Sequence, residues 1–273
     1  MSTIINLWDN PPLMIEGKKS PTLHYYATDK KSENKSCVLL FAGGGYENVC
    51  VNHEGVTYVD FFGKLGFDAF VLDYRVKPYS FPVPVLDARR AVRVIRNHAK
   101  ELGINENKIL VMGSSAGGHL AAFLSTYEGK IDGEGIDEID KIDCKPNGQI
   151  LCYPVIEPIG HLLSFKNFSG GREELFESLM PSRLVNANTP PAFMWHTARD
   201  QSVNVINTLN YAKALKEHDV SCEMHIFPDG KHSLALSLGE DKISKHVHSW
   251  VDLLVKWLKY MNFCEVNCNV NDI

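Results

Sequence analysis

Short runs of apolar residues recur along the chain, and amphipathic segments separate them. The runs lie at 22–28, 37–42, 68–74, 108–112, 148–153, 191–197 and 221–227. Several of them are almost continuously apolar, which is typical of parallel strands that are covered on both faces. The pattern therefore predicts a mostly parallel sheet rather than a sheet with one face in water.

Helices are predicted between these strands. Within 84–102, apolar residues recur at steps of three and four and form one stripe along a helix. Residues 246–261 repeat this spacing near the C-terminus. Strands and helices that alternate in this way favour right-handed crossovers and a sheet flanked by helices. We expect a single α/β domain over 1–273.

Two segments interrupt the alternation. Residues 127–148 are acidic and contain glycine, and they lack the spacing of a calcium-binding loop, so we expect a solvent-exposed excursion. Residues 157–185 lie between two predicted strands and are expected to form a small helical lid over one end of the sheet. This second segment would be an insertion within the single domain.

Charge and cysteine content limit the choice of partners and compartment. The net charge of −5 disfavours nucleic acid or an anionic membrane as the main partner, so Arg89, Arg93 and Arg96 on helix 84–102 are interpreted as a solvated face. No run approaches the roughly 20 apolar residues of a membrane span, and 1–17 lack the features of a signal peptide. The seven cysteines include no C-x-x-C pair, which favours free thiols, no metal site and a cytoplasmic protein.

One stretch carries a candidate nucleophile. The sequence GSSAG at 113–117 fits the pattern G-x-S-x-G, in which the central serine, here Ser115, sits on a sharp turn between a strand and a helix. Here the pattern follows the predicted strand 108–112 and opens a helix-forming run, which is the context that the motif requires. The turn would also place the N–H of Ala116 at the start of the helix, where negative charge is favoured. A tight turn without chemistry is the alternative.

A serine nucleophile needs a base, and the base needs a carboxylate that orients it. His232 lies directly after the last predicted strand, at the position expected for such a base. Asp200 follows the preceding strand and is preferred as the acid. Asp229 is the alternative, but it is only three residues from His232 and lies in an Asp-Gly turn, which favours a role in shaping the loop.

A developing oxyanion needs at least two N–H donors. Ala116 would provide one of them. The run Gly43, Gly44 and Gly45 follows an early strand and would let the backbone turn its N–H groups inward without a side-chain clash. A plain loop explains three glycines equally well when they are considered alone.

These segments together resemble the α/β-hydrolase superfamily, and more closely its bacterial acetyl-esterase and xylan-esterase-like members, which are carbohydrate esterase-like. The resemblance spans about 37–260 and rests on FAGGGY, on the tract from DYRVKP to GSSAGGHLAA, and on CYPVI, TPPAFMWHTARDQSV and FPDGKHSLAL. It implies an α/β-hydrolase fold, with Ser115, Asp200 and His232 as the catalytic triad and Gly44, Gly45 and Ala116 as oxyanion donors. Hormone-sensitive-lipase-like enzymes have histidine where this chain has Ala42, which moves the placement toward enzymes of small esters.

The resemblance also implies an activity. We expect a serine esterase that cleaves short-chain carboxylic esters such as acetylated sugars, with a small-molecule substrate and no cofactor. Tyr46, His53 and Glu54 follow the glycine run and are candidate substrate contacts, although a role in ordering the loop is equally open for His53 and Glu54. An amidase, peptidase or formamidase would use the same triad, and a non-catalytic binding protein on this fold is the third possibility.

Overall fold

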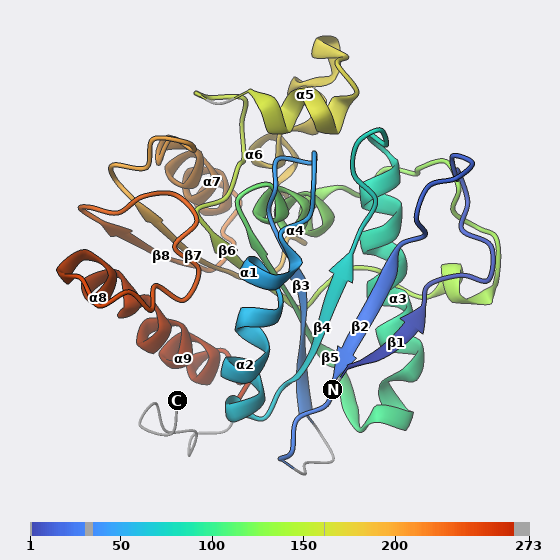
Figure 1. Ribbon diagram of the computed structural model, residues 1–273, viewed down its shortest axis with the longest axis horizontal. Helices are drawn as coiled ribbons and strands as arrows, with labels where there is room; N and C mark the ends of the chain where they lie inside the picture. The colour runs from blue at the N-terminus through green and yellow to red at the C-terminus, as the bar shows by residue number, and fades with distance from the viewer. Residues whose placement is uncertain (1, 31–34, 161, 265–273) are drawn as a thin grey trace.

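The computed structural model describes residues 2–30, 35–160 and 162–264 (Figure 1). In this part of the chain an eight-stranded sheet has the order β1-β2-β4-β3-β5-β6-β7-β8. β1 and β2 run antiparallel to each other, β2 runs antiparallel to β4, and the pairs from β4 to β8 are parallel. The strands are β1 (Thr3–Asn6), β2 (Thr22–Tyr26), β3 (Lys35–Phe41), β4 (Asp68–Asp73), β5 (Ile104–Ser114), β6 (Gly148–Cys152), β7 (Ala192–Thr197) and β8 (Cys222–Phe227).

The apolar runs of the sequence account for every strand except β1. That strand is short and mostly exposed at the edge of the sheet, so it carries little of the apolar signal on which the prediction depended. The central strands are buried on both faces: β6 and β7 are buried along their whole length. The prediction of a mostly parallel sheet is confirmed.

Two hydrophobic clusters lie on the two faces of the sheet, and successive residues of β3 alternate between them. Leu39 and Phe41 belong to the cluster that includes apolar residues of α3 (Val83–Leu102), α4 (Ala116–Thr126) and α7 (Ile206–Glu217). Val38 and Leu40 belong to the cluster formed with α2 (Val59–Leu65) and α9 (Trp250–Tyr260). Alternation of this kind follows from the two-residue period of a strand. It fixes the register that brings the strand ends together.

The predicted C-terminal helix is two helices. α8 (Lys242–His248) ends at His248, Ser249 caps it, and α9 begins at Trp250. At the junction the N–H of Ser249 bonds to the carbonyl of His246, three residues back, which tightens the turn. The periodic pattern runs through this junction because both helices present apolar residues to the same cluster. No helix in the described part of the chain combines the length and apolar character needed to cross a membrane.

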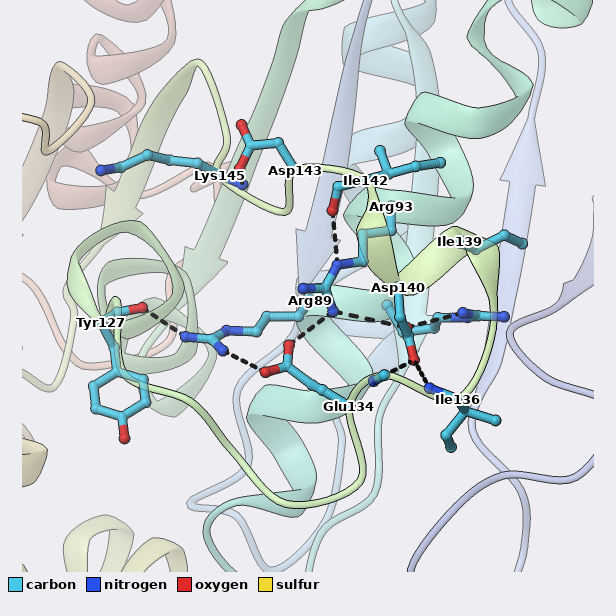
Figure 2. A network of polar contacts seen from close by, with 12 residues as sticks. Arg89, Arg93, Tyr127, Glu134, Ile136, Ile139, Asp140, Ile142, Asp143 and Lys145 are labelled. Atoms are coloured by element: carbon cyan, nitrogen blue, oxygen red, sulfur yellow. Dashed lines mark hydrogen bonds and ion pairs between the residues drawn. The ribbon is translucent and has the colours of Figure 1, made fainter.

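The structure corrects the interpretation of the arginines on α3. Arg89 and Arg93 are buried, because segment 127–148 folds over them, and Glu134 of that segment accepts from both at 2.9 and 2.7 Å (Figure 2). Arg96 donates to backbone carbonyls of the same segment. These arginines therefore anchor a loop and do not form a solvated face.

Segment 157–185, predicted as a lid, contains two short helices, α5 (Leu163–Ser169) and α6 (Pro181–Leu184), and two 3-10 turns. In Figure 1, α5 lies beyond the end of the sheet at the top of the view. Asn167 of α5 donates to the carbonyl of Gly45 at 2.9 Å, so the segment contacts the glycine-rich loop that follows β3. Residue 161 within this segment lies outside the described residues.

Candidate active site

The turn between β5 and α4 places Ser115 in a strained conformation. Its φ and ψ are 54° and −119°, a region that residues with a side chain rarely adopt. The glycines on either side are needed for the close approach of the backbone. A Cβ on Gly113 would lie 2.1 Å from the carbonyl oxygen of Gly117, and a Cβ on Gly117 would lie 2.0 Å from that of Phe41. This is the geometry of a nucleophile elbow.

The structure brings the three predicted triad residues together. The Oγ of Ser115 lies 2.8 Å from Nε2 of His232, and Nδ1 of His232 lies 2.6 Å from Oδ2 of Asp200. The alternative acid, Asp229, is 43% exposed and pairs with Arg199 at 3.1 Å. The three groups form one hydrogen-bonded line that starts at the C-terminal end of β5 and reaches the loops after β7 and β8. This geometry favours Asp200 as the acid.

Both oxygens of the Asp200 carboxylate are occupied. Oδ1 accepts the N–H groups of Ser202 and Val203 at 2.8 and 2.9 Å. Oδ2 accepts from His232 and lies 3.3 Å from Nε2 of His196. Burial by itself raises the pKa of Asp200, but the hydrogen bonds from the two imidazoles and from the backbone outweigh it and hold the pKa well below its usual range. The carboxylate is therefore ionised at neutral pH.

His196 is a residue of the site that the sequence reasoning missed. It is fully buried, its Nδ1 lies 2.7 Å from the hydroxyl of Thr208, and its Nε2 lies 3.0 Å from the carbonyl of Val203. Because Nε2 faces two acceptors, Asp200 and Val203, we assign the proton to Nε2 and the acceptor role to Nδ1. The signal in the sequence is a histidine four residues before Asp200, within an apolar run whose pattern indicates a buried strand.

The glycine loop after β3 lies against the nucleophile. A Cβ built on Gly43 would be 3.0 Å from Cβ of Ser115. The N–H of Gly43 donates to Oε2 of Glu54 at 2.9 Å, so that amide is already engaged. Gly44 and Gly45 have φ values of 129° and 65°, which favour glycine, and a Cβ on Gly44 would lie 2.3 Å from the carbonyl oxygen of Asn48. The role of Gly44, Gly45 and Ala116 as oxyanion donors stays a prediction.

Two of the three candidate substrate contacts do not fit the structure. The side chain of Tyr46 is 1% exposed, and its hydroxyl bonds to Nδ1 of His119 at 2.8 Å inside the core. Burial lowers the pKa of His119 to about 4, so this histidine is neutral at physiological pH. Glu54 is 3% exposed and is occupied by protein donors. His53 is exposed, and its Nε2 lies 2.9 Å from the carbonyl of Ser233, so its contact with a substrate stays a prediction.

Within the described ranges, no group of three or more histidine, cysteine, aspartate or glutamate side chains is placed to hold a metal ion. What the site presents instead is a serine at a strained turn, a histidine within hydrogen-bond distance of it, and an ionised carboxylate behind the histidine. That set of groups is suited to nucleophilic attack on a carbonyl carbon.

A mostly parallel sheet with a nucleophile elbow after β5, a carboxylate after β7 and a histidine after β8 is the α/β-hydrolase fold. A comparison with family models matches residues 23–215 to BD-FAE, and the chain belongs to this family. The resemblance to acetyl- and xylan-esterase-like hydrolases that the sequence indicated is thereby confirmed.

Named relatives agree with this placement. The chain is 34% identical over 214 residues to endo-1,4-beta-xylanase B of Butyrivibrio fibrisolvens. This alignment covers 76% of this chain and 33% of that protein. It is 30% identical over 233 residues to the acetylxylan esterase of Xylanibacter ruminicola, which covers 80% of this chain and 46% of that protein. The chain thus spans less than half the length of either relative.

A solved structure is similar to this chain over nearly its full length. The crystal structure of the acetyl ester-xyloside bifunctional hydrolase from Caldicellulosiruptor lactoaceticus is 39% identical, with a TM-score of 0.89. The alignment covers 96% of this chain and 97% of that one. The likeness therefore extends over nearly the whole of both chains.

Proposed function

We propose that the protein is a serine esterase that cleaves short-chain carboxylic esters, with acetylated sugars as its substrate class. The observation that carries this proposal is the line of hydrogen bonds from Ser115 through His232 to Asp200, at 2.8 and 2.6 Å. The names of the relatives, an acetylxylan esterase and an acetyl ester-xyloside hydrolase, support an acetyl ester as the substrate.

The proposed reaction uses the three hydrogen-bonded groups together with the proposed oxyanion donors. His232 takes the proton of the Ser115 hydroxyl as its oxygen attacks the ester carbonyl, and the oxyanion is stabilised by the N–H groups of Gly44, Gly45 and Ala116. The C–O bond to the alcohol breaks, and the alcohol leaves with the proton from His232. Water then gives a proton to His232 and attacks the acyl-enzyme. The bond from the acyl carbon to the serine oxygen breaks, His232 returns its proton to that oxygen, and the carboxylic acid is released. Asp200 holds the imidazole and stabilises its charged form.

The apolar surface beside the glycine loop supports a small acyl group. Leu162 and Leu163 at the start of α5 are each 38% exposed. A Cβ on Gly45 would lie 3.7 Å from Cδ2 of Leu163, so this side chain lies directly against the loop of the proposed oxyanion donors. We propose that Leu163 limits the space for the acyl chain, and that segment 157–185 acts as a lid. The cytoplasm remains the predicted location, on the basis of the free thiols.

The test is hydrolysis of p-nitrophenyl acetate, butyrate and octanoate by the wild type and by Ser115→Ala, followed by acetylated xylose and xylo-oligosaccharides. The expected result is the highest kcat/KM with acetate and a loss of roughly 10⁶-fold in kcat for the variant. Cleavage of an anilide or an N-formyl substrate in preference to every ester would favour an amidase or formamidase. If a fluorophosphonate did not label Ser115 and no substrate were cleaved, a non-catalytic binding protein would be the better interpretation.

A further inference from the structure

A second buried carboxylate lies beside the proposed triad. Glu54, in the short helix α1 (Val51–Glu54), is 3% exposed and accepts three hydrogen bonds from neutral donors. The N–H of Gly43 donates to Oε2 at 2.9 Å, and the hydroxyls of Tyr153 and Ser233 donate to Oε1 at 2.9 and 2.6 Å. Burial of a carboxylate is costly unless its oxygens are hydrogen-bonded, and here both are.

The three donors lie in three different segments around the proposed triad. Gly43 directly precedes the proposed oxyanion donors, and Ser233 directly follows His232. Tyr153 follows β6, and its ring packs edge-on against His232, with 5.0 Å between the ring centroids. Its hydroxyl also accepts the N–H of Ala235, at 3.1 Å. A single carboxylate therefore connects the oxyanion loop to both the residue after the histidine and the ring beneath it.

The loop that carries His232 needs such support. Ser233 and Ala235 have φ values of 63° and 49°, a conformation that costs roughly 1 kcal/mol or more for a residue with a side chain. Such a backbone conformation is kept only where contacts with the surrounding residues stabilise it. Two residues of α1 make these contacts: Glu54 accepts from the hydroxyl of Ser233, and Nε2 of His53 bonds to the carbonyl of Ser233.

We propose that Glu54 is a positioning residue that fixes the oxyanion loop relative to His232. The proposal rests on the proposed esterase function, because it concerns the same attack by Ser115. The oxyanion donors and the proton transfer by His232 act in the transition state, so an error in their relative position lowers kcat and leaves KM nearly unchanged. A residue that merely stabilised the fold would change neither constant in the folded enzyme.

Two variants of Glu54 and one matched control test the proposal. In Glu54→Gln the amide oxygen can still accept the N–H of Gly43, and the hydroxyls of Tyr153 and Ser233 can turn to accept from the amide NH₂ group. The hydrogen bonds are kept but become neutral, and charge-assisted hydrogen bonds are roughly twice as strong as neutral ones. We therefore expect kcat to fall about tenfold. Glu54→Met removes all the acceptors at nearly the same length, and kcat is expected to fall about 100-fold or more, as when an oxyanion donor is lost. KM is expected to stay within about threefold in both, since the ground state uses neither group. A kcat that is higher in Glu54→Gln than in Glu54→Met, with KM nearly unchanged in both, would indicate a positioning role.

The control is Asp68→Asn. Asp68 is as buried as Glu54 and also has three donors, the hydroxyl of Tyr25, the N–H of Thr28 and Nζ of Lys35, at 2.9, 2.9 and 2.8 Å. It begins β4, at the end of the sheet opposite the site. This variant is expected to lose stability in urea with kcat unchanged. Glu54→Gln with kcat within twofold of the wild type overturns the proposal, and so does a loss confined to KM. If Glu54→Met does not fold, the glutamine variant decides alone.

A failure of the proposed function is separated from a failure of this inference by the rate of labelling with a fluorophosphonate. If the wild type cleaves no ester but is labelled at Ser115, the esterase assignment fails, and slower labelling of Glu54→Gln than of the wild type still supports the positioning role. Equal labelling rates overturn it. A wild type that is not labelled overturns both proposals.

Discussion

Replacement of Asp200 by asparagine tests how the carboxylate sets the protonation of His232. In the wild type, Oδ1 of Asp200 accepts the N–H groups of Ser202 and Val203. These two donors would hold the oxygen of the new amide in the same place, so the NH₂ group would take the position of Oδ2. There it donates to Nδ1 of His232, which lies 2.6 Å away in the wild type. An imidazole that accepts at Nδ1 carries its proton at Nε2 and cannot take the proton of Ser115.

The magnitude follows from this change of tautomer. The same substitution in a Ser-His-Asp enzyme lowers kcat by about 10⁴, which corresponds to roughly 5.5 kcal/mol in the activation free energy. We expect a loss of this size for Asp200→Asn with KM nearly unchanged, because the ester itself does not contact the carboxylate. The assay is the initial rate of p-nitrophenyl acetate hydrolysis at pH 7.5, with Ser115→Ala as the baseline.

Asp229→Asn is the matched control. It makes the same chemical change close to His232 in the sequence, but Asp229 is half-exposed and pairs only with Arg199 among the contacts described for it. Its kcat is expected to stay within twofold of the wild type. An Asp200→Asn enzyme that kept kcat within tenfold of the wild type would refute the reasoning from amide orientation. A comparable loss in both variants would show that the effect is not specific to the hydrogen bond with Nδ1.

Two further predictions concern the fold around the site. Gly117→Ala places a Cβ 2.0 Å from the carbonyl oxygen of Phe41, and urea unfolding is expected to show a free energy of unfolding lower by about 3 kcal/mol or more. Gly63→Ala in α2 is the control, because the new Cβ would meet open space, and it is expected to raise the free energy of unfolding by up to about 1 kcal/mol. Equal effects of the two substitutions would contradict the steric argument. The pKa of Asp200 is lower in the folded protein than in the unfolded chain, where it is about 3.9, so the ionised carboxylate stabilises the fold at pH values above about 3.9. This stabilisation is lost as the pH falls from about 3.9 toward the pKa of the folded protein. Urea unfolding between pH 6 and pH 3 is therefore expected to show a steeper loss for the wild type than for Asp200→Asn, and parallel curves would contradict the assignment.

The features that the sequence predicted correctly have local causes. The elbow at Ser115 needs glycine at 113 and 117 because backbone atoms only a few residues away, or on the neighbouring strand, would collide with a Cβ. Residues 200 and 232 stand directly after apolar strands, and parallel strands end at the same edge of a sheet. Local pattern and the geometry of a parallel sheet were therefore enough to bring these three residues together.

The features that it missed depend on contacts between segments that are far apart in the chain. Glu54 contacts Ser233 across 179 positions, and no spacing rule connects them. The sequence of α3 shows the same spacing of apolar and charged residues whether water or segment 127–148 covers the arginines. Periodicity therefore could not predict that Arg89 and Arg93 are buried and paired with Glu134. A charged residue in an amphipathic pattern is interpreted as exposed until its partner is known.

Asp200 in the proposed triad and Glu54 beside it have different roles because their donors differ. Each uses one oxygen to hold backbone N–H groups of its own loop, at Ser202 and Val203 for Asp200 and at Gly43 for Glu54. The other oxygen of each carboxylate accepts from the histidine loop, from His232 for Asp200 and from Ser233 for Glu54, and also contacts one residue outside that loop. Asp200 does so through an imidazole, and its charge therefore acts on the proton that moves. Glu54 accepts from the hydroxyl of Ser233, the residue after His232, and therefore contributes to the position of the imidazole that receives the proton. Adjacent residues of one strained loop thus contact two different carboxylates, so the position and the protonation of the base are set by separate groups.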